Sequence, residues 1–112
     1  MQERMKGIIK SAAAPGAEYR EDLPIPQIGE DDLLVRVCVT AICGTDQHIY
    51  KWNEWAQARI PVPMVFGHEF SGDVVAVGKN VRGFAPGDRV AAETHIPCQQ
   101  CYQCKTGDQH NC

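Results

Sequence analysis

Two groups of residues in this sequence carry side chains that bind metal ions, and the sharper one is a run of four cysteines. Their spacing, C-x2-C-x2-C-x7-C, puts three thiolates on successive tight turns and lets a fourth complete a tetrahedron around one ion. Zinc suits four thiolates with no open position, and it would hold together a polar segment that lacks apolar periodicity. The spacing therefore predicts a structural zinc site at Cys98, Cys101, Cys104 and Cys112.

Two other interpretations of these four cysteines stay open at this point. The first three share the spacing of bacterial ferredoxins, which bind iron–sulfur clusters, but ferredoxins place the fourth cysteine sooner and follow it with proline. A disulfide framework is the second alternative, although a chain without an export signal meets reducing conditions that keep thiol pairs open. The sequence favours zinc, and visible absorbance from a brown protein would exclude it.

The second group combines different ligand types from two distant stretches. A thiol, a hydroxyl, a carboxylate and an imidazole lie within the six positions from Cys43 to His48. His68 and Glu69 then place a nitrogen and an oxygen ligand side by side. Cysteine, histidine and carboxylate together suit zinc with an open coordination position. Taken alone the pattern is weak, because only a fold can join the two stretches and a His-Glu pair is more often ordinary surface.

The elements that must position these residues are mainly short strands, because prolines and glycines punctuate the chain throughout. Val35, Val37 and Val39 alternate on one face of the strongest predicted strand, and Cys38 between them is expected to be a packed or half-exposed thiol. We predict strands over residues 5–10, 18–22, 33–41, 70–77 and 89–93.

Helix signals are weak, and the best one runs from Asp46 to Trp55. Either Thr45 or Asp46 has a side chain that can cap a helix at this point. Ile49, Trp52 and Trp55 recur at helical spacing, which fits one short helix whose tryptophans lie in the core or at a domain contact.

Composition limits the classes of protein that this chain can represent. With 112 residues, of which 44% are hydrophobic and 22% charged, it suits one globular domain. A net charge of -3 gives no basic field for phosphates, so neither nucleic acid nor a membrane surface is an expected partner. The first residues lack the apolar run of a signal peptide or a membrane span, which predicts a cytoplasmic location.

Three motifs in order then resemble the zinc-dependent medium-chain alcohol dehydrogenase superfamily. The four-cysteine run is similar to the structural zinc loop of that superfamily, and the other two motifs resemble its first-ligand motif and its zinc signature. These two motifs are Cys43-Gly44-Thr45-Asp46 and Gly67-His68-Glu69-Phe70-Ser71-Gly72, the latter followed by Gly78 and Val81.

The resemblance implies a catalytic zinc bound by Cys43, His68 and Glu69. Zinc would act as a Lewis acid on the hydroxyl group of a substrate whose carbon then releases hydride to a nicotinamide ring. Thr45 and His48 match the hydroxyl and the histidine that pass the released proton to solvent in this superfamily, and they are the predicted catalytic residues. Asp46 is expected to accept a hydrogen bond from the metal-bound imidazole and not to bind the metal itself.

The resemblance also implies a fold and a wider organisation. The fold would be the GroES-like domain, a bent and mainly antiparallel β-barrel with few short helices, spanning 1–112 with the zinc lobe at 94–112. No Gly-x-Gly-x-x-Gly follows a strand in the sequence, so the NAD-binding Rossmann domain is expected outside this chain, which alone would be inactive. The full-length enzyme would hold two zinc ions per subunit and form a homotetramer.

The substrate is a small molecule by the same resemblance. The segment His48 to Gln57, with Ile60-Pro61-Val62-Pro63 after it, resembles the branch that oxidises the secondary hydroxyl of L-threonine to 2-amino-3-oxobutanoate. A butanediol or sorbitol dehydrogenase of the same superfamily is the first alternative. A non-catalytic zinc-binding interaction module is the second, but it leaves Cys43, Thr45 and His68 without a role.

Overall fold

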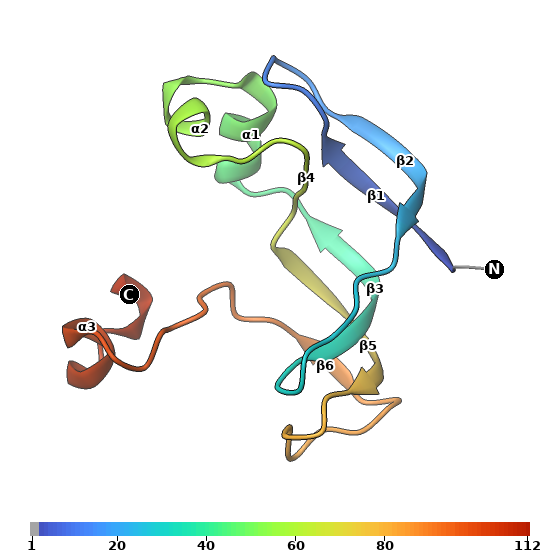
Figure 1. The fold of residues 1–112 in the computed structure, drawn as a ribbon, viewed down its shortest axis with the longest axis vertical. Coiled ribbons are helices and arrows are strands. Elements are labelled where there is room, and N and C mark those ends of the chain that lie inside the picture. The colour runs from blue at the N-terminus through green and yellow to red at the C-terminus, as the bar shows by residue number, and fades with distance from the viewer. Residues whose placement is uncertain (1–2) are drawn as a thin grey trace.

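The computed structural model describes residues 3–112, so the predicted domain is seen from its third residue onward, and residues 1 and 2 lie outside the described part. Strands dominate the first three quarters of the chain, and short helices follow the third and the last strand (Figure 1). In chain order the elements are β1 (Arg4–Lys10), β2 (Glu18–Pro24), β3 (Leu33–Ala41), α1 (Gly44–Lys51), α2 (Glu54–Arg59), β4 (Met64–Val65), β5 (Glu69–Val77), β6 (Arg89–Ala91), α3 (Tyr102–Thr106) and the 3-10 helix η1 (Gln109–Asn111).

The mainly β fold with a few short helices and a cysteine lobe is confirmed. Each of the five predicted strands has a counterpart, in β1, β2, β3, β5 and β6. The strand β4 was missed, because a two-residue strand at Met64–Val65 is too short to show an alternating pattern. It is recognised only by its pairing with β1, where Val65 lies opposite Ile9.

The strands form two antiparallel sheets of three strands each, in the orders β2-β1-β4 and β3-β5-β6. We call them the N-terminal sheet and the central sheet. In the central sheet β3 pairs with β5 along its whole length, from Leu33 opposite Val77 to Ala41 opposite Glu69. The end of β3 therefore lies beside the beginning of β5, although the two are separated in sequence by both helices.

The valine alternation predicted for β3 is interrupted by an irregularity in the pairing. The register shifts between Val37, which lies opposite Gly72, and Val39, which lies opposite Ser71. Cys38 between them is the extra residue of a β-bulge, which breaks the two-residue side-chain period. Val37 and Val39 are both exposed, and so is Cys38, where a packed or half-exposed thiol was predicted.

The single helix predicted from Asp46 to Trp55 is wrong in both its bounds and its continuity. The chain forms α1 and α2, separated by Trp52 in the left-handed conformation at φ 56°. Cys43 is the N-cap of α1, in place of the predicted Thr45 or Asp46, because Asp46 in the first turn accepts a hydrogen bond from the Cys43 N–H at 2.9 Å. Ile49 is buried as expected.

The turn between β1 and β2 is tied to the end of α1. The Gly16 N–H donates to the Tyr50 carbonyl at 2.8 Å. Lys10 is 1% exposed, and its ammonium donates to the carbonyls of Ala14 and Gly16 and lies 4.9 Å from the centre of the Trp52 ring. Burial lowers the pKa of Lys10. These contacts join the N-terminal sheet to the helix that follows Cys43.

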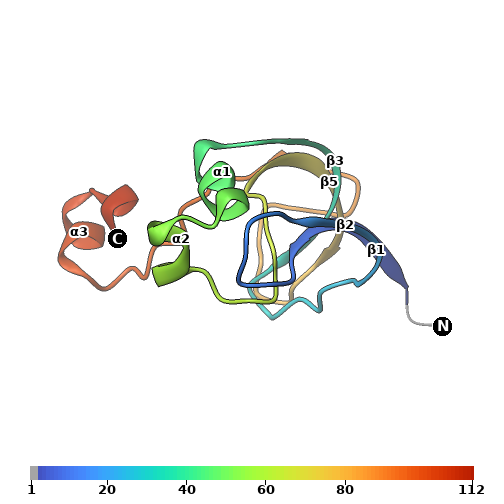
Figure 2. The same ribbon diagram turned by 90° about the horizontal axis from the view of Figure 1, so that it is seen from above.

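The chain is open in shape for its length. Its radius of gyration is 15.9 Å, whereas a compact chain of this size has about 13 Å. The segment after β6, with α3 and η1, projects away from both sheets in two perpendicular views (Figures 1 and 2). We call residues 98–112 the cysteine lobe.

Within residues 3–112, no helix has both the length and the apolar character needed to cross a membrane.

Candidate metal centres

The central sheet brings together the residues of the second predicted group. Cys43 follows the end of β3 at Ala41, and Ala41 is paired with Glu69 at the start of β5. His68 precedes Glu69 directly. One ligand atom from each of Cys43, His68 and Glu69 therefore lies within 4.8 Å of the others. The register of the central sheet thus brings together the two stretches that the sequence alone could not place side by side.

Two glycines in the same stretch allow this approach. Gly67 has φ 117°, a conformation that L side chains rarely adopt, so the chain can turn sharply just before His68. A Cβ atom on Gly72 would lie 2.3 Å from the carbonyl oxygen of Arg36 in β3, which is closer than any ordinary contact. Glycine at position 72 therefore permits the close pairing of β3 and β5.

Asp46 lies behind the imidazole of His68. Its side chain is buried, at 4% exposure, and one carboxylate oxygen, Oδ2, accepts the hydrogen bond from Cys43 N–H. The other, Oδ1, lies 3.6 Å from His68 Nδ1 and has no hydrogen-bond partner among the described residues. With Nδ1 facing this carboxylate, Nε2 is the nitrogen of His68 that is left for a metal ion.

The predicted catalytic pair lies on α1. Thr45 is half-buried in the first turn, and His48 is exposed three residues later, a spacing that places two side chains next to each other on a helix surface. His48 Nδ1 lies 2.6 Å from the side-chain nitrogen of Asn53, and its ring centre is 5.9 Å from that of Trp55. Sequence reasoning missed Asn53, although an asparagine before Glu54 is a recognisable N-cap signal.

The four cysteines of the lobe also converge. Their sulfurs lie within 4.8 Å of one another, and Cys98 Sγ is 3.9 Å from Cys104 Sγ. A tetrahedral zinc with bonds of about 2.3 Å places two sulfurs about 3.8 Å apart. All six cysteines of the chain are free thiols, and the separation of the Cys98 and Cys104 sulfurs is close to the one that a single tetrahedral ion requires.

The lobe holds its sulfurs in two different environments. Cys98 Sγ accepts hydrogen bonds from the backbone N–H groups of Gln100 at 3.4 Å and Cys101 at 3.3 Å. These donors lower the pKa of Cys98 to about 6, which favours the thiolate form that metals bind. Burial raises the pKa of Cys104 to about 12, so a metal ion must displace the proton of this thiol.

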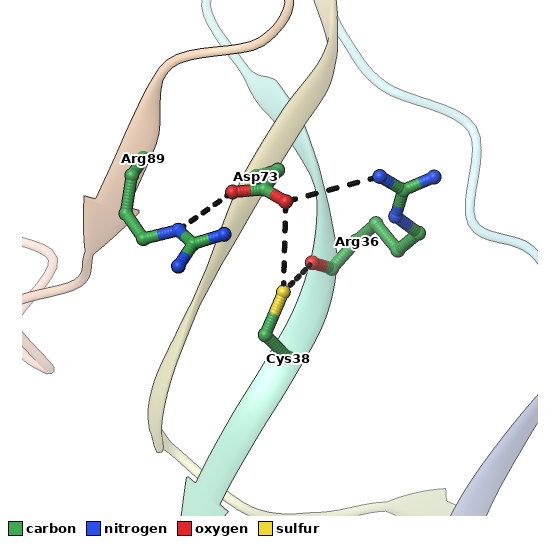
Figure 3. Close-up of polar contacts among 4 residues, drawn as sticks. All are labelled: Arg36, Cys38, Asp73 and Arg89. Atoms are coloured by element: carbon green, nitrogen blue, oxygen red, sulfur yellow. Dashed lines mark hydrogen bonds and ion pairs between the residues drawn. The ribbon is translucent and has the colours of Figure 1, made fainter.

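A second polar cluster crosses the central sheet at some distance along the strands from Glu69. Figure 3 shows Asp73 of β5 between Arg89 of β6 and Arg36 of β3, with the Cys38 thiol below it. Arg89 Nε donates to Asp73 Oδ1 at 2.7 Å, and Arg36 lies 3.8 Å from Oδ2. The hydrogen bond from Arg89 is the main cause of the lowered pKa of Asp73. The cluster ties the three strands together.

A large apolar hollow of about 920 Å³ lies between the two sheets and α1. Ile8, Val37, Tyr50, Phe70 and the buried Asp46 are among its lining residues. None of Cys43, His68 or Glu69 lines it. The candidate metal ligands therefore do not line this hollow, although Asp46 and Gly67 beside them do.

The chain is similar in sequence to known proteins. The family described as "Alcohol dehydrogenase GroES-like domain" matches residues 29–112. Among curated proteins, the chain is 56% identical over 108 residues to L-threonine 3-dehydrogenase of Aeromonas salmonicida and 51% identical over 109 residues to that of Protochlamydia amoebophila. Each match covers 96% of this chain. The chain spans about a third of the length of these relatives, at 31% and 32%.

Solved structures show the same fold. An NAD-dependent alcohol dehydrogenase matches with a TM-score of 0.83 at 34% identity, covering 96% of this chain and 31% of that one. Galactitol-1-phosphate dehydrogenase from Escherichia coli matches with a TM-score of 0.81 at 31% identity, covering 96% of this chain and 30% of that one. The predicted GroES-like fold is thereby confirmed.

Proposed function

The chain belongs to the alcohol dehydrogenase GroES-like domain family, and from this premise we propose that it is the zinc-binding N-terminal domain of a dehydrogenase that oxidises L-threonine with NAD. The observation that carries the proposal is the approach of one ligand atom each from Cys43, His68 and Glu69 to within 4.8 Å. Three protein ligands of the cysteine, histidine and carboxylate types are the donors found in catalytic zinc sites, where water or substrate takes the fourth position.

The surroundings of this site fit a zinc ion. Asp46 Oδ1 is buried without a hydrogen-bond partner among the described residues, and it faces His68 Nδ1. A metal-bound histidine usually donates its other ring N–H to a carboxylate, which fixes the ring and the tautomer. Asp46 would therefore orient His68 toward the metal, while its Oδ2 atom fixes the backbone of Cys43.

Zinc held by Cys43, His68 and Glu69 would supply a Lewis acid, which eases the loss of the proton from a substrate hydroxyl. Thr45 and His48 are the residues that would carry this proton toward solvent, since they lie one helical turn apart and His48 is exposed. The lobe cysteines, whose sulfurs match the separation expected around one tetrahedral ion, would hold a second zinc with a structural role.

The substrate is proposed from the relatives. Both curated relatives described above are named L-threonine 3-dehydrogenase, at 56% and 51% identity, whereas the galactitol-1-phosphate dehydrogenase is 31% identical. NAD would bind mainly to a domain outside these 112 residues, in keeping with relatives about three times as long. The homotetramer stays a prediction.

The test uses the full-length chain that carries this domain. We expect about two zinc ions per chain by elemental analysis, one at each site, and the highest kcat/KM with L-threonine when it is compared with 2,3-butanediol and sorbitol. Cys43→Ser should lose one zinc and nearly all activity, whereas Cys38→Ser, the matched control at an exposed cysteine outside both sites, should lose neither.

Different outcomes would contradict different parts of the proposal. A clear preference for a sugar alcohol would contradict L-threonine as the substrate but would still support oxidation of an alcohol as the reaction. Two bound zinc ions without dehydrogenase activity on any of the three substrates would favour the non-catalytic zinc module. A full complement of zinc in Cys43→Ser would remove Cys43 from the catalytic site.

A further inference from the structure

His48 is held on two sides by the connection between α1 and α2. Its Nδ1 atom lies 2.6 Å from Asn53 Nδ2, and its ring packs against Trp55 at an interplanar angle of 49°. The Asn53 backbone N–H also donates to the His48 carbonyl at 3.4 Å. The ring orientation of this exposed histidine is therefore set by the start of α2.

The orientation of the Asn53 amide follows from its role as the N-cap of α2. The backbone N–H of Ala56 donates to Asn53 Oδ1 at 3.1 Å. A backbone N–H can only donate, so the side-chain atom that faces it must be the oxygen. The other terminal atom, which faces His48, is then the amide nitrogen, which offers hydrogens and no lone pair.

We propose that Asn53 is a positioning residue that holds the neutral His48 imidazole in the tautomer with its proton on Nε2. A neutral imidazole has one N–H and one bare nitrogen, and only a bare Nδ1 can accept the hydrogen bond from the Asn53 amide. Nε2 then carries the hydrogen and is the nitrogen left free to meet a hydroxyl or water as a donor. The Trp55 contact limits rotation of the ring away from this arrangement.

This tautomer has a consequence for proton transfer, which rests on the proposed function. A proton passed to neutral His48 must form its new N–H bond at Nδ1, as the O–H bond of the donating water or hydroxyl breaks, since Nε2 is already protonated. The hydrogen bond from Asn53 must break at that moment, and the Nε2–H bond then breaks to release a proton to water. The ring ends in the other tautomer, with two donors facing each other, and returns by exchanging protons with water.

Two substitutions separate the effect on the ring from the effect on the helix. Asn53→Asp keeps a capping oxygen for Ala56, because asparagine and aspartate are about equally good N-caps, and it turns a carboxylate oxygen toward Nδ1, which should move the proton to Nδ1. Asn53→Ser also keeps a capping hydroxyl but is too short to reach the ring, so both tautomers should be populated.

The readout is solid-state 15N NMR of the full-length chain with labelled histidine, at about pH 9, where an ordinary imidazole is neutral. The two ring-nitrogen signals of His48 are identified as those that disappear in the His48→Gln variant. We expect Nε2–H in the wild type, Nδ1–H in Asn53→Asp, and a tautomer ratio that differs by roughly tenfold or more between them. Zinc content should be the same in all three proteins.

Nδ1–H in the wild type, or an unchanged tautomer in Asn53→Asp, would overturn the inference. Nδ1–H in the wild-type spectrum overturns the inference even where a variant fails to fold, and a shift toward a tautomer mixture in Asn53→Ser tests the contact independently of Asn53→Asp. Neither substrate nor NAD enters the measurement, so failure of the proposed threonine oxidation would appear in the steady-state assays and leave the spectrum unaffected.

Discussion

The two candidate zinc sites are built from the chain in opposite ways. The four cysteines of the lobe come from one short stretch, Cys98 to Cys112, and they need only local turns to converge. The other site takes Cys43 from the start of the long connection between β3 and β5, and His68 and Glu69 from its end. These residues meet because β3 pairs with β5. Under the proposed zinc binding, the lobe would depend on its metal, whereas the second site depends on the pairing of two strands.

The burial of the two regions agrees with this difference. In the lobe, the buried residue is Cys104, itself one of the ligands, so a bound ion has to replace an apolar core. At the other site, Asp46 and Ile49 of α1 are buried and the strands are paired along their length. Changes to the ligands should thus unfold the lobe, whereas changes to the central sheet should empty the catalytic site.

The largest effect is expected from Cys104→Ser. Loss of one of four thiolates should release the structural zinc, so the zinc content of the full-length chain should fall from about two to about one ion. Hydrogen exchange of residues 98–112 should rise to that of an unfolded segment, because α3 and η1 have no apolar core of their own. Elemental analysis and exchange mass spectrometry measure both effects.

In the same experiment β3 and β5 should keep their protection, and Cys38→Ser should change nothing in the lobe. Slow exchange throughout the lobe after loss of its zinc would mean that the metal does not hold this region together.

The converse test is Gly72→Ala. The added methyl group meets the Arg36 carbonyl at 2.3 Å, so β3 and β5 must separate, at a cost of about 1–3 kcal/mol in the free energy of unfolding. We expect loss of the zinc at Cys43, His68 and Glu69 with the lobe zinc retained. Chemical denaturation and metal analysis of the full-length chain test this.

Gly44→Ala is the matched control for Gly72→Ala. It adds the same methyl group on α1, where no atom lies within 4 Å, and it should preserve stability and both metals. If Gly72→Ala released the lobe zinc first, the proposed independence of the two sites would be wrong.

A smaller and more specific change is expected from Asp46→Asn. The substitution keeps the shape of the side chain but weakens the acceptor for His68 Nδ1, so affinity for the catalytic zinc should fall by about 10–100-fold. Competition with a chelator of known affinity measures this, and the thermal unfolding temperature should move little. Retention of zinc equal to that of the wild type would show that Asp46 does not orient His68.

The two candidate metal sites also differ in how far the sequence alone predicts them. Cysteine spacing encodes the lobe directly, since C-x2-C-x2-C-x7-C brings its members together through local turns alone. The spacing between Cys43 and His68 carries no such information, because their approach depends on the register that places Ala41 opposite Glu69. Resemblance to a family supplied that second prediction.

The errors have local causes. One helix was predicted where two form, because apolar periodicity continues across Trp52, whereas the left-handed conformation of Trp52 interrupts the helix. The bulge at Cys38 was not foreseen, since it depends on the pairing of β3 with β5. The contact of Asn53 with His48 needs both helices in place, so only the structure reveals it.

The smallest expected effect concerns the cohesion of the central sheet. The hydrogen bond from Arg89 holds the pKa of Asp73 below its ordinary value. Asp73 is therefore protonated at a higher pH in the unfolded chain than in the folded chain. The Asp73 contribution to stability is therefore complete above the ordinary aspartate pKa of about 3.9 and is lost as the pH falls through its lower folded value.

Asp73→Asn should accordingly lower the stability of the sheet at pH 7, and the difference from the wild type should shrink as the pH falls toward about 3. Thermal unfolding of both proteins with a chelator present measures this difference without a contribution from acid-driven metal release. Arg36→Gln is the control, because Arg36 is exposed and its guanidinium lies farther from Asp73, at 3.8 Å against 2.7 Å for Arg89. A difference for Asp73→Asn that stays constant with pH would show that the carboxylate charge contributes nothing to the stability of the central sheet.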